Sequence, residues 1–196
     1  MNSAPSGSGP AVALTARDRI VETAHRLFYG EGIRATGIDR VIAEAQVTKV
    51  TFYRHFPSKN HLVLDFLERR HVAWMAWFTE ALQRHRPRAA PPVAAIAPAL
   101  REWFDSPDYR GCAFINAVSE VAAITPGVRE IAARHKAEMV AVLSTLLPPG
   151  RHRRRDAEAL GVAVDGAIVR AQVDGRSEAA LSGLAILVRP FAAGPD

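Results

Sequence analysis

The chain has 196 residues, of which 48% are hydrophobic and 23% charged, and its 25 Lys and Arg against 20 Asp and Glu give a formal net charge of +5. These proportions are typical of a globular protein and exclude a chain that is disordered throughout, collagen-like or a disulfide scaffold. A single cysteine, Cys112, cannot close an intramolecular disulfide, and no run approaches the roughly eighteen apolar residues of a membrane-spanning helix.

The N-terminal segment, residues 1–14, predicts a disordered tail. Its first ten residues are mostly Ser, Gly, Pro and Ala, and they lack the basic and apolar regions of a signal peptide. We therefore expect a cytoplasmic protein. Residues 1–60 hold 8 basic and 5 acidic side chains, an excess that weakly indicates a polyanionic partner near the N-terminus.

Hydrophobic spacing predicts an all-α fold of about nine helices, with no sustained strand alternation and no internal repeat. In chain order the helices are expected at 16–29, 37–45, 48–56, 59–86, 93–104, 112–124, 126–147, 156–172 and 177–189. Polar residues typical of helix starts precede several of them, namely Thr15, Thr36, Thr48, Ser58, Thr125 and Ser177. The Arg-rich run 151–155 is expected to be a solvated loop, because cations are unfavourable in the first turn of a helix.

The two short helices at 37–45 and 48–56 match the size of a helix-turn-helix, although a helical hairpin of any α-bundle has the same pattern. Phe52 and Phe56, one turn apart, can anchor the second helix to a core. Its other face is rich in hydrogen-bond donors and has no acidic residue. Such a surface suits phosphates and base edges.

Two segments here resemble the DNA-binding domain of TetR/AcrR-type transcriptional regulators: TGIDRVIAEA at residues 36–45 and VTKVTFYRHFPSK at residues 47–59. The resemblance covers about residues 15–65, and RGCAFINA at residues 110–117 is similar to a motif in the ligand-binding domains of one group of these regulators. The resemblance to this family implies a homodimeric repressor that a small-molecule effector releases from its double-stranded DNA operator. Residues 15–60 would form the DNA-binding domain and 61–196 the regulatory and dimerisation domain.

By motif position, the resemblance also implies roles for individual residues. The base contacts in the major groove would be Thr48, Lys49 and Tyr53. The phosphate contacts would be Thr36, Thr51, His55 and Lys59. Val50 stands where the family often has a small residue, and it either blocks close approach to the bases or contacts a thymine methyl group. Tyr53 and His55 as ordinary surface side chains are the alternative.

Large aromatic residues are concentrated in the middle of the chain, where they form either plain core or a cavity for an apolar or aromatic effector. The candidate pocket residues are Trp74, Trp77, Phe78, Trp103 and Phe114, with Asn116 and Glu120 either orienting the ligand or lying at an exposed edge.

The last two helices carry long apolar stripes, which predict half of a four-helix bundle completed by a second subunit. The candidate interface residues are Leu160, Val164, Ala167, Ile168, Leu181, Leu184 and Val188. Packing within one subunit is the alternative.

Other classes of function have little support in the sequence. The seven histidines lack metal-ligand spacing, so we expect no metal and no cofactor. Cys112 fits a small buried hydrophobe better than a redox sensor. No G-x-S-x-G, Walker-type, G-x-G-x-x-G or H-E-x-x-H motif is present, so we expect no enzyme. An RNA-binding protein that uses the arginines of 151–155 is the remaining alternative.

Overall fold

Helices make up the fold of residues 14–192, the part of the chain that this computed structural model describes, and no strand occurs in that part. The α-helices are α1 (Ala16–Glu31), α2 (Ile38–Glu44), α3 (Lys49–His55), α4 (Lys59–Arg84), α5 (Ile96–Phe104), α6 (Ala113–Val121), α7 (Val128–Ser144), α8 (Arg153–Asp174) and α9 (Glu178–Val188). Two short 3-10 segments lie at Pro92–Ala95 and Arg189–Ala192. The predicted all-α class and helix order are confirmed. The tail predicted for 1–14 lies outside the described residues, apart from Leu14.

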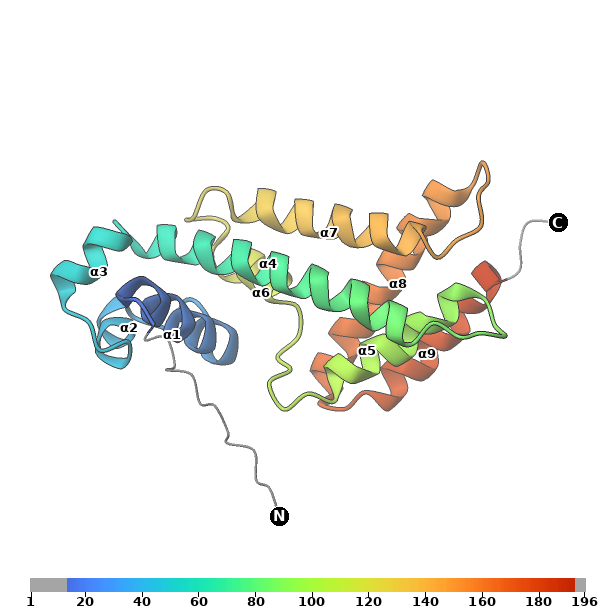
Figure 1. Ribbon diagram of the computed structural model, residues 1–196, viewed down its shortest axis with the longest axis horizontal. Coiled ribbons are helices and arrows are strands. Elements are labelled where there is room, and N and C mark those ends of the chain that lie inside the picture. Colours follow the sequence, from blue (N-terminus) through green and yellow to red (C-terminus); the bar gives the residue numbers. More distant parts are fainter. Residues whose placement is uncertain (1–13, 193–196) are drawn as a thin grey trace, which may run out of the picture.

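Helix α4 is the long axis of the described molecule (Figure 1). Helices α1, α2 and α3 gather at its N-terminal end, while α5, α8 and α9 gather toward its other end. Helix α7 runs beside α4 and packs against both α4 and α8. Because α4 contacts α1 as well as α5 and α7, it joins the N-terminal helices to the rest of the chain.

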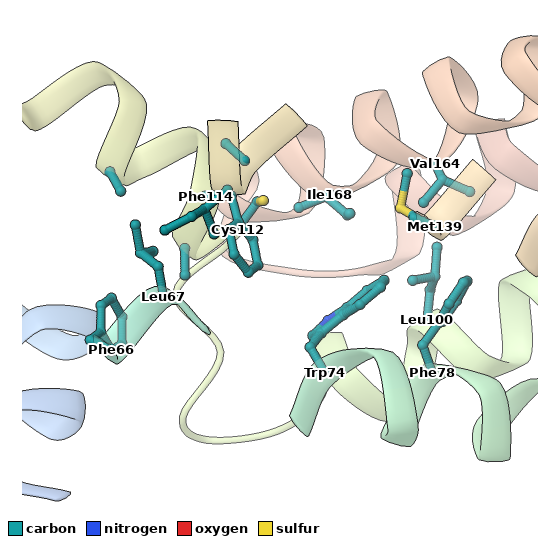
Figure 2. Close-up of a cluster of buried hydrophobic side chains, with 14 of the residues drawn as sticks. Phe66, Leu67, Trp74, Phe78, Leu100, Cys112, Phe114, Met139, Val164 and Ile168 are labelled. Carbon is teal, nitrogen blue, oxygen red and sulfur yellow. The ribbon is translucent and has the colours of Figure 1, made fainter. Parts of the chain in front are cut away.

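One continuous core runs along the inner face of α4. Its side chains recur at the spacing of three and four residues that places them on one helical face. They are Leu62, Val63, Phe66, Leu67, His71, Trp74, Phe78, Ala81 and Leu82. Figure 2 shows part of this cluster, to which residues of α5, α6, α7 and α8 also contribute.

Three of the predicted helix caps are present. The hydroxyl of Thr15 accepts a hydrogen bond from the Asp18 N–H, that of Thr48 from the Thr51 N–H and that of Ser58 from the His61 N–H. The cap predicted at Thr36 was wrong. Gly37 precedes α2 instead, while Thr36 is fully buried and its hydroxyl donates to the Gly32 carbonyl at 2.8 Å.

At two later helix starts tertiary partners take the hydroxyl groups, and the cap predicted at Thr125 was wrong. Helix α7 begins at Val128 after Gly127, and Thr125 Oγ1 donates to Asn60 Oδ1 at 3.1 Å. Ser177 precedes α9 as predicted, but its hydroxyl donates to Asp105 Oδ1 at 2.8 Å.

The Arg-rich run is not wholly a loop, since α8 begins at Arg153. Arg153 Nε donates to the Ser144 carbonyl at the end of α7, at 2.8 Å, and Arg155 pairs with Asp156 at 2.9 Å. These acceptors offset the unfavourable position of cations at the start of a helix.

Candidate DNA-binding surface and ligand cavity

Helix α3 has one buried and one exposed side. Phe52 and Phe56 are buried in the core, as the sequence predicted. Val50 is 79% exposed and Tyr53 41% exposed, and the rings of Tyr53 and Phe52 form a T-shaped pair at a centroid distance of 5.3 Å. The Tyr53 ring therefore packs against Phe52 and remains accessible to solvent.

Arg19 of α1 holds the turn between α2 and α3. Its Nε donates to the Ala45 carbonyl at 3.1 Å, and its Nη1 donates to the Leu14 carbonyl at 3.2 Å. The next residue of the turn, Gln46, has a φ of 53°, in the left-handed region that non-glycine residues seldom adopt. Sequence reasoning missed Arg19, because an arginine in the first turns of an amphipathic helix resembles any other surface cation.

The polar side chains predicted to bind DNA cluster at the start of α3. Thr48 Oγ1 caps the helix and lies 2.9 Å from Thr51 Oγ1. Lys49 Nζ lies 3.4 Å from Asp39 Oδ1, so α2 places a carboxylate beside this face, which the α3 sequence alone did not reveal. Both side chains are largely exposed, and an exposed pair of this kind contributes little stability. A DNA contact could replace it at small cost.

The remaining predicted contacts divide into two groups. His55, the last residue of α3, and Lys59, the first residue of α4, are half-buried. Burial lowers the pKa of Lys59, and the charge of Glu120 partly opposes that shift. Thr36 lies apart in the interior, with its hydroxyl already bonded, so it is not on the exposed face.

A cavity of about 800 Å³ lies between α1, α4, α5 and the loop before α6. This volume is within the usual range for small-molecule sites. Trp74, Trp77 and Trp103, which are all the tryptophans of the chain, line it together with Tyr29. Three arginines also line it, Arg26, Arg70 and Arg110, which no sequence pattern had marked.

Four predicted pocket residues do not line this cavity. Phe78 is fully buried and stacks on Trp74, and Phe114 stacks on His135 at 3.7 Å. Asn116 Nδ2 donates to the Arg110 carbonyl at 3.1 Å. Glu120 Oε2 accepts a hydrogen bond from the Arg34 N–H at 2.9 Å, so this carboxylate joins α6 to the segment after α1.

The predicted interface residues on α8 and α9 are buried within the subunit itself, which corrects the assignment of these side chains to a partner. They are Leu160, Val164, Ala167, Ile168, Leu181, Leu184 and Val188. Other apolar side chains of the same helices are 43–77% exposed, namely Val162, Val169, Val173, Ile186 and Leu187. Both helices are apolar on more than one face, and periodicity cannot tell which face meets the subunit core.

The short helix pair, its exposed second helix and the larger helical part define a helix-turn-helix transcriptional regulator. Comparison with known proteins leads further. Residues 20–66 match the family described as "Bacterial regulatory proteins, tetR family". SCO4454, a TetR-family regulator from Streptomyces coelicolor, is 34% identical, with 91% of this chain and 96% of that chain aligned and a TM-score of 0.78. The chain belongs to the TetR family.

One further relative agrees with this assignment, and one further solved structure shares the fold. The HTH-type transcriptional repressor NemR of Escherichia coli is 26% identical over 69% of this chain and 68% of its own length. The multidrug binding protein EbrR, solved with malachite green, has the same fold, with 20% identity, a TM-score of 0.69, and 90% of this chain and 98% of that chain aligned. TetR-family regulators bind DNA operators as dimers and are not enzymes. Within residues 14–192, no helix combines the length and apolar character needed to cross a bilayer.

Proposed function

We propose that this protein is a repressor that binds operator DNA as a homodimer and leaves it when a small molecule occupies the cavity beside α1. In this proposal residues 15–60 form the DNA-binding unit, and residues 61–196 form the regulatory and dimerisation unit. The observation that carries the proposal is the exposed polar face of α3, which Arg19 of α1 holds through the turn before it.

The DNA contacts follow from the positions of the side chains on this face. Thr48, Lys49 and Tyr53 read base edges in the major groove, and Val50, exposed between them, meets thymine methyl groups. The backbone phosphates are bound by Thr51, His55 and Lys59. Thr36 is left out because its hydroxyl is buried and bonded to Gly32.

Dimerisation uses the exposed apolar side chains of α8 and α9, which a second subunit would cover by completing a four-helix bundle. Two recognition helices about 34 Å apart can enter successive major grooves of one DNA face. Release requires that the ligand bind the DNA-competent and released states with different affinities. Because the cavity is lined by α1 as well as by α4 and α5, a ligand in it contacts both units. The solved complex of EbrR with malachite green supports the proposal of a small-molecule site.

The DNA-binding part is tested by selecting bound sequences from a random DNA pool. Fluorescence anisotropy then compares the selected duplex with a scrambled duplex at several salt concentrations. Lys49→Ala and Tyr53→Ala should each weaken selective binding roughly tenfold or more, the usual cost of losing a base contact. The double variant Arg151→Ala with Arg154→Ala is the control, because these exposed arginines lie far from α3 in the chain.

Two outcomes would contradict this proposal. The first is equal binding to both duplexes that fades steeply with salt, which is the signature of unspecific attraction to phosphates. The second is loss of binding in the arginine control with no effect at Lys49 and Tyr53, which would favour the RNA-binding alternative.

A further inference from the structure

We infer that the cavity beside α1 binds an aromatic anion, whose acidic group is held by Arg70 of α4. This inference rests on the proposed function in taking the cavity as the effector site, and it names the chemical class of the effector. It goes beyond the apolar or aromatic ligand that the sequence suggested.

Arg70 is a half-buried cation without a charge partner. Among the described residues, no carboxylate oxygen lies within 4.0 Å of its guanidinium nitrogens. Its guanidinium carbon lies 4.1 Å from the centre of the Tyr29 ring, and its Nη1 lies 3.5 Å from His25 Nε2. Burial and the charge of Arg70 lower the pKa of His25, which keeps that ring neutral beside the arginine at neutral pH.

The carboxylates on the rim do not neutralise Arg70. Glu31 is paired with Arg40, which lies outside the cavity. Glu102 accepts from Trp77 Nε1 at 3.0 Å and pairs with Arg84, also outside the cavity, at 2.6 Å.

The other rim charges leave a second available cation. Arg26 is paired with Glu44 of α2. Among the described residues, the guanidinium of Arg110 donates only to the carbonyls of Pro107 and Tyr109, at 3.0 and 2.7 Å, and one exposed carboxylate, Asp108, lies beside it. Arg70 and Arg110 are therefore the cations of this cavity that an incoming anion can reach without displacing a carboxylate.

Aromatic side chains form another part of the cavity wall. Trp74 is 6% exposed, and its ring stacks on Phe78 and lies 6.0 Å from the Trp77 ring, centroid to centroid. Beside it, the rings of Trp77 and Trp103 lie 6.0 Å apart and are half-buried, a surface suited to a flat aromatic body.

The same contacts provide a route from ligand to DNA-binding unit. The hydroxyl of Tyr29 accepts a hydrogen bond from the Arg110 N–H at 3.1 Å and donates to the Gly111 carbonyl at 3.0 Å. These bonds tie α1 to the loop before α6. An anion that pulls the Arg70 guanidinium away from the Tyr29 ring changes the contacts of Tyr29, the residue that links α1 to this loop.

The test uses two probes with one aromatic skeleton, 8-anilinonaphthalene-1-sulfonate and its uncharged counterpart N-phenyl-1-naphthylamine. Energy transfer from the three tryptophans, which all line the cavity, reports bound probe, and its dependence on Arg70 assigns the bound probe to the cavity. Wild-type protein should bind the sulfonate more tightly, and Arg70→Gln should weaken sulfonate binding roughly tenfold or more while sparing the neutral probe. Arg70→Lys should retain part of the preference. Arg69→Gln is the matched control, since the neighbouring Arg69 pairs with Asp65 and does not line the cavity.

Equal affinity for the two probes, an Arg70→Gln variant that binds the sulfonate as wild type does, or no saturable binding of either probe would overturn the inference. The switch is measured separately, by the affinity for the selected duplex with each probe present. A sulfonate that binds through Arg70 but leaves DNA affinity unchanged would support the ligand class and contradict the proposed release. Release by both probes without dependence on Arg70 would support the switch and overturn the ligand class.

Discussion

At the scale of single residues, the most unusual polar contact in the core is between two histidines of α4 and α7. His71 Nδ1 and His135 Nδ1 lie 3.2 Å apart, so one ring donates a hydrogen bond to the other. His71 Nε2 lies 3.2 Å from Glu138 Oε2, and Phe114 covers the second ring. Burial, with the charge of Lys136 second, lowers the pKa of His135 to about 3, so this side chain is neutral in the folded protein.

This shift predicts that acid destabilises the protein through His135. Below its usual pKa of 6.5 the unfolded chain binds a proton there and the folded chain does not. The free energy of unfolding should therefore fall by up to about 1.4 kcal/mol per pH unit as the pH drops from that value toward the folded pKa. Urea unfolding at a series of pH values measures the slope. His135→Gln should have a shallower slope, and identical slopes in both proteins would refute the assignment.

At the scale of secondary-structure elements, the contact between α7 and α8 depends on a missing side chain. A Cβ atom on Gly161 of α8 would lie 2.7 Å from Val140 Cγ2 of α7, which is too close for two carbon atoms. Valine is branched at Cβ and cannot easily turn aside. The glycine therefore permits close packing of the two helices, at the cost of its low helix propensity.

We expect Gly161→Ala to lower the free energy of unfolding by roughly 1–2 kcal/mol, because the overpacking exceeds the gain in helix propensity. Gly30→Ala, near the end of α1, is the matched control, since no atom lies within 4 Å of a Cβ placed there. That variant should be more stable than wild type by up to about 1 kcal/mol. Chemical denaturation of both variants measures the difference, and a stabilised Gly161→Ala protein would show that α7 and α8 can separate freely.

At the scale of the whole molecule, the exposed apolar side chains of α8 and α9 are the surface that a single subunit leaves uncovered. Val162, Val169 and Val173 are spaced by seven and four residues, which places them on one face of α8. Ile186 and Leu187 extend the apolar surface onto α9, which packs against α8. Because regulators of this family bind DNA as dimers, each subunit needs a surface that contacts its partner. We propose that the exposed apolar side chains of α8 and α9 form this surface.

The double variant Val162→Asp with Val173→Asp should therefore be monomeric by light scattering, because two pairs of like charges would be buried at the interface. Its fold should persist, since both side chains are exposed in the subunit. Its affinity for the selected duplex should fall at least roughly tenfold, because each monomer reaches only one half-site. Val72→Asp, on an exposed position of α4, should remain a dimer with normal DNA binding. If the double variant remained dimeric, the dimer interface would have to lie on another surface of the subunit.

Local interactions explain which features could be predicted from sequence. The caps at Thr15, Thr48 and Ser58 were predictable because the hydroxyl and the N–H that it caps are three residues apart. At Thr125 and Ser177 the hydroxyls bond Asn60 and Asp105, which lie 65 and 72 residues away in the chain. A pattern of neighbouring residues cannot reveal such partners.

The sequence by itself determined the order of the helices and the polar face of α3, because both follow from the spacing of residues within one helix. Only the tertiary structure decided which apolar face of α8 meets the subunit core and which of the predicted pocket residues line a cavity. It alone also revealed that Arg70 lies in this cavity without a carboxylate partner among the described residues. These properties depend on how each helix is rotated against others that are distant in the chain. The rotation of each helix is set by packing over the whole core. The hydrophobic period of a single helix is compatible with several rotations.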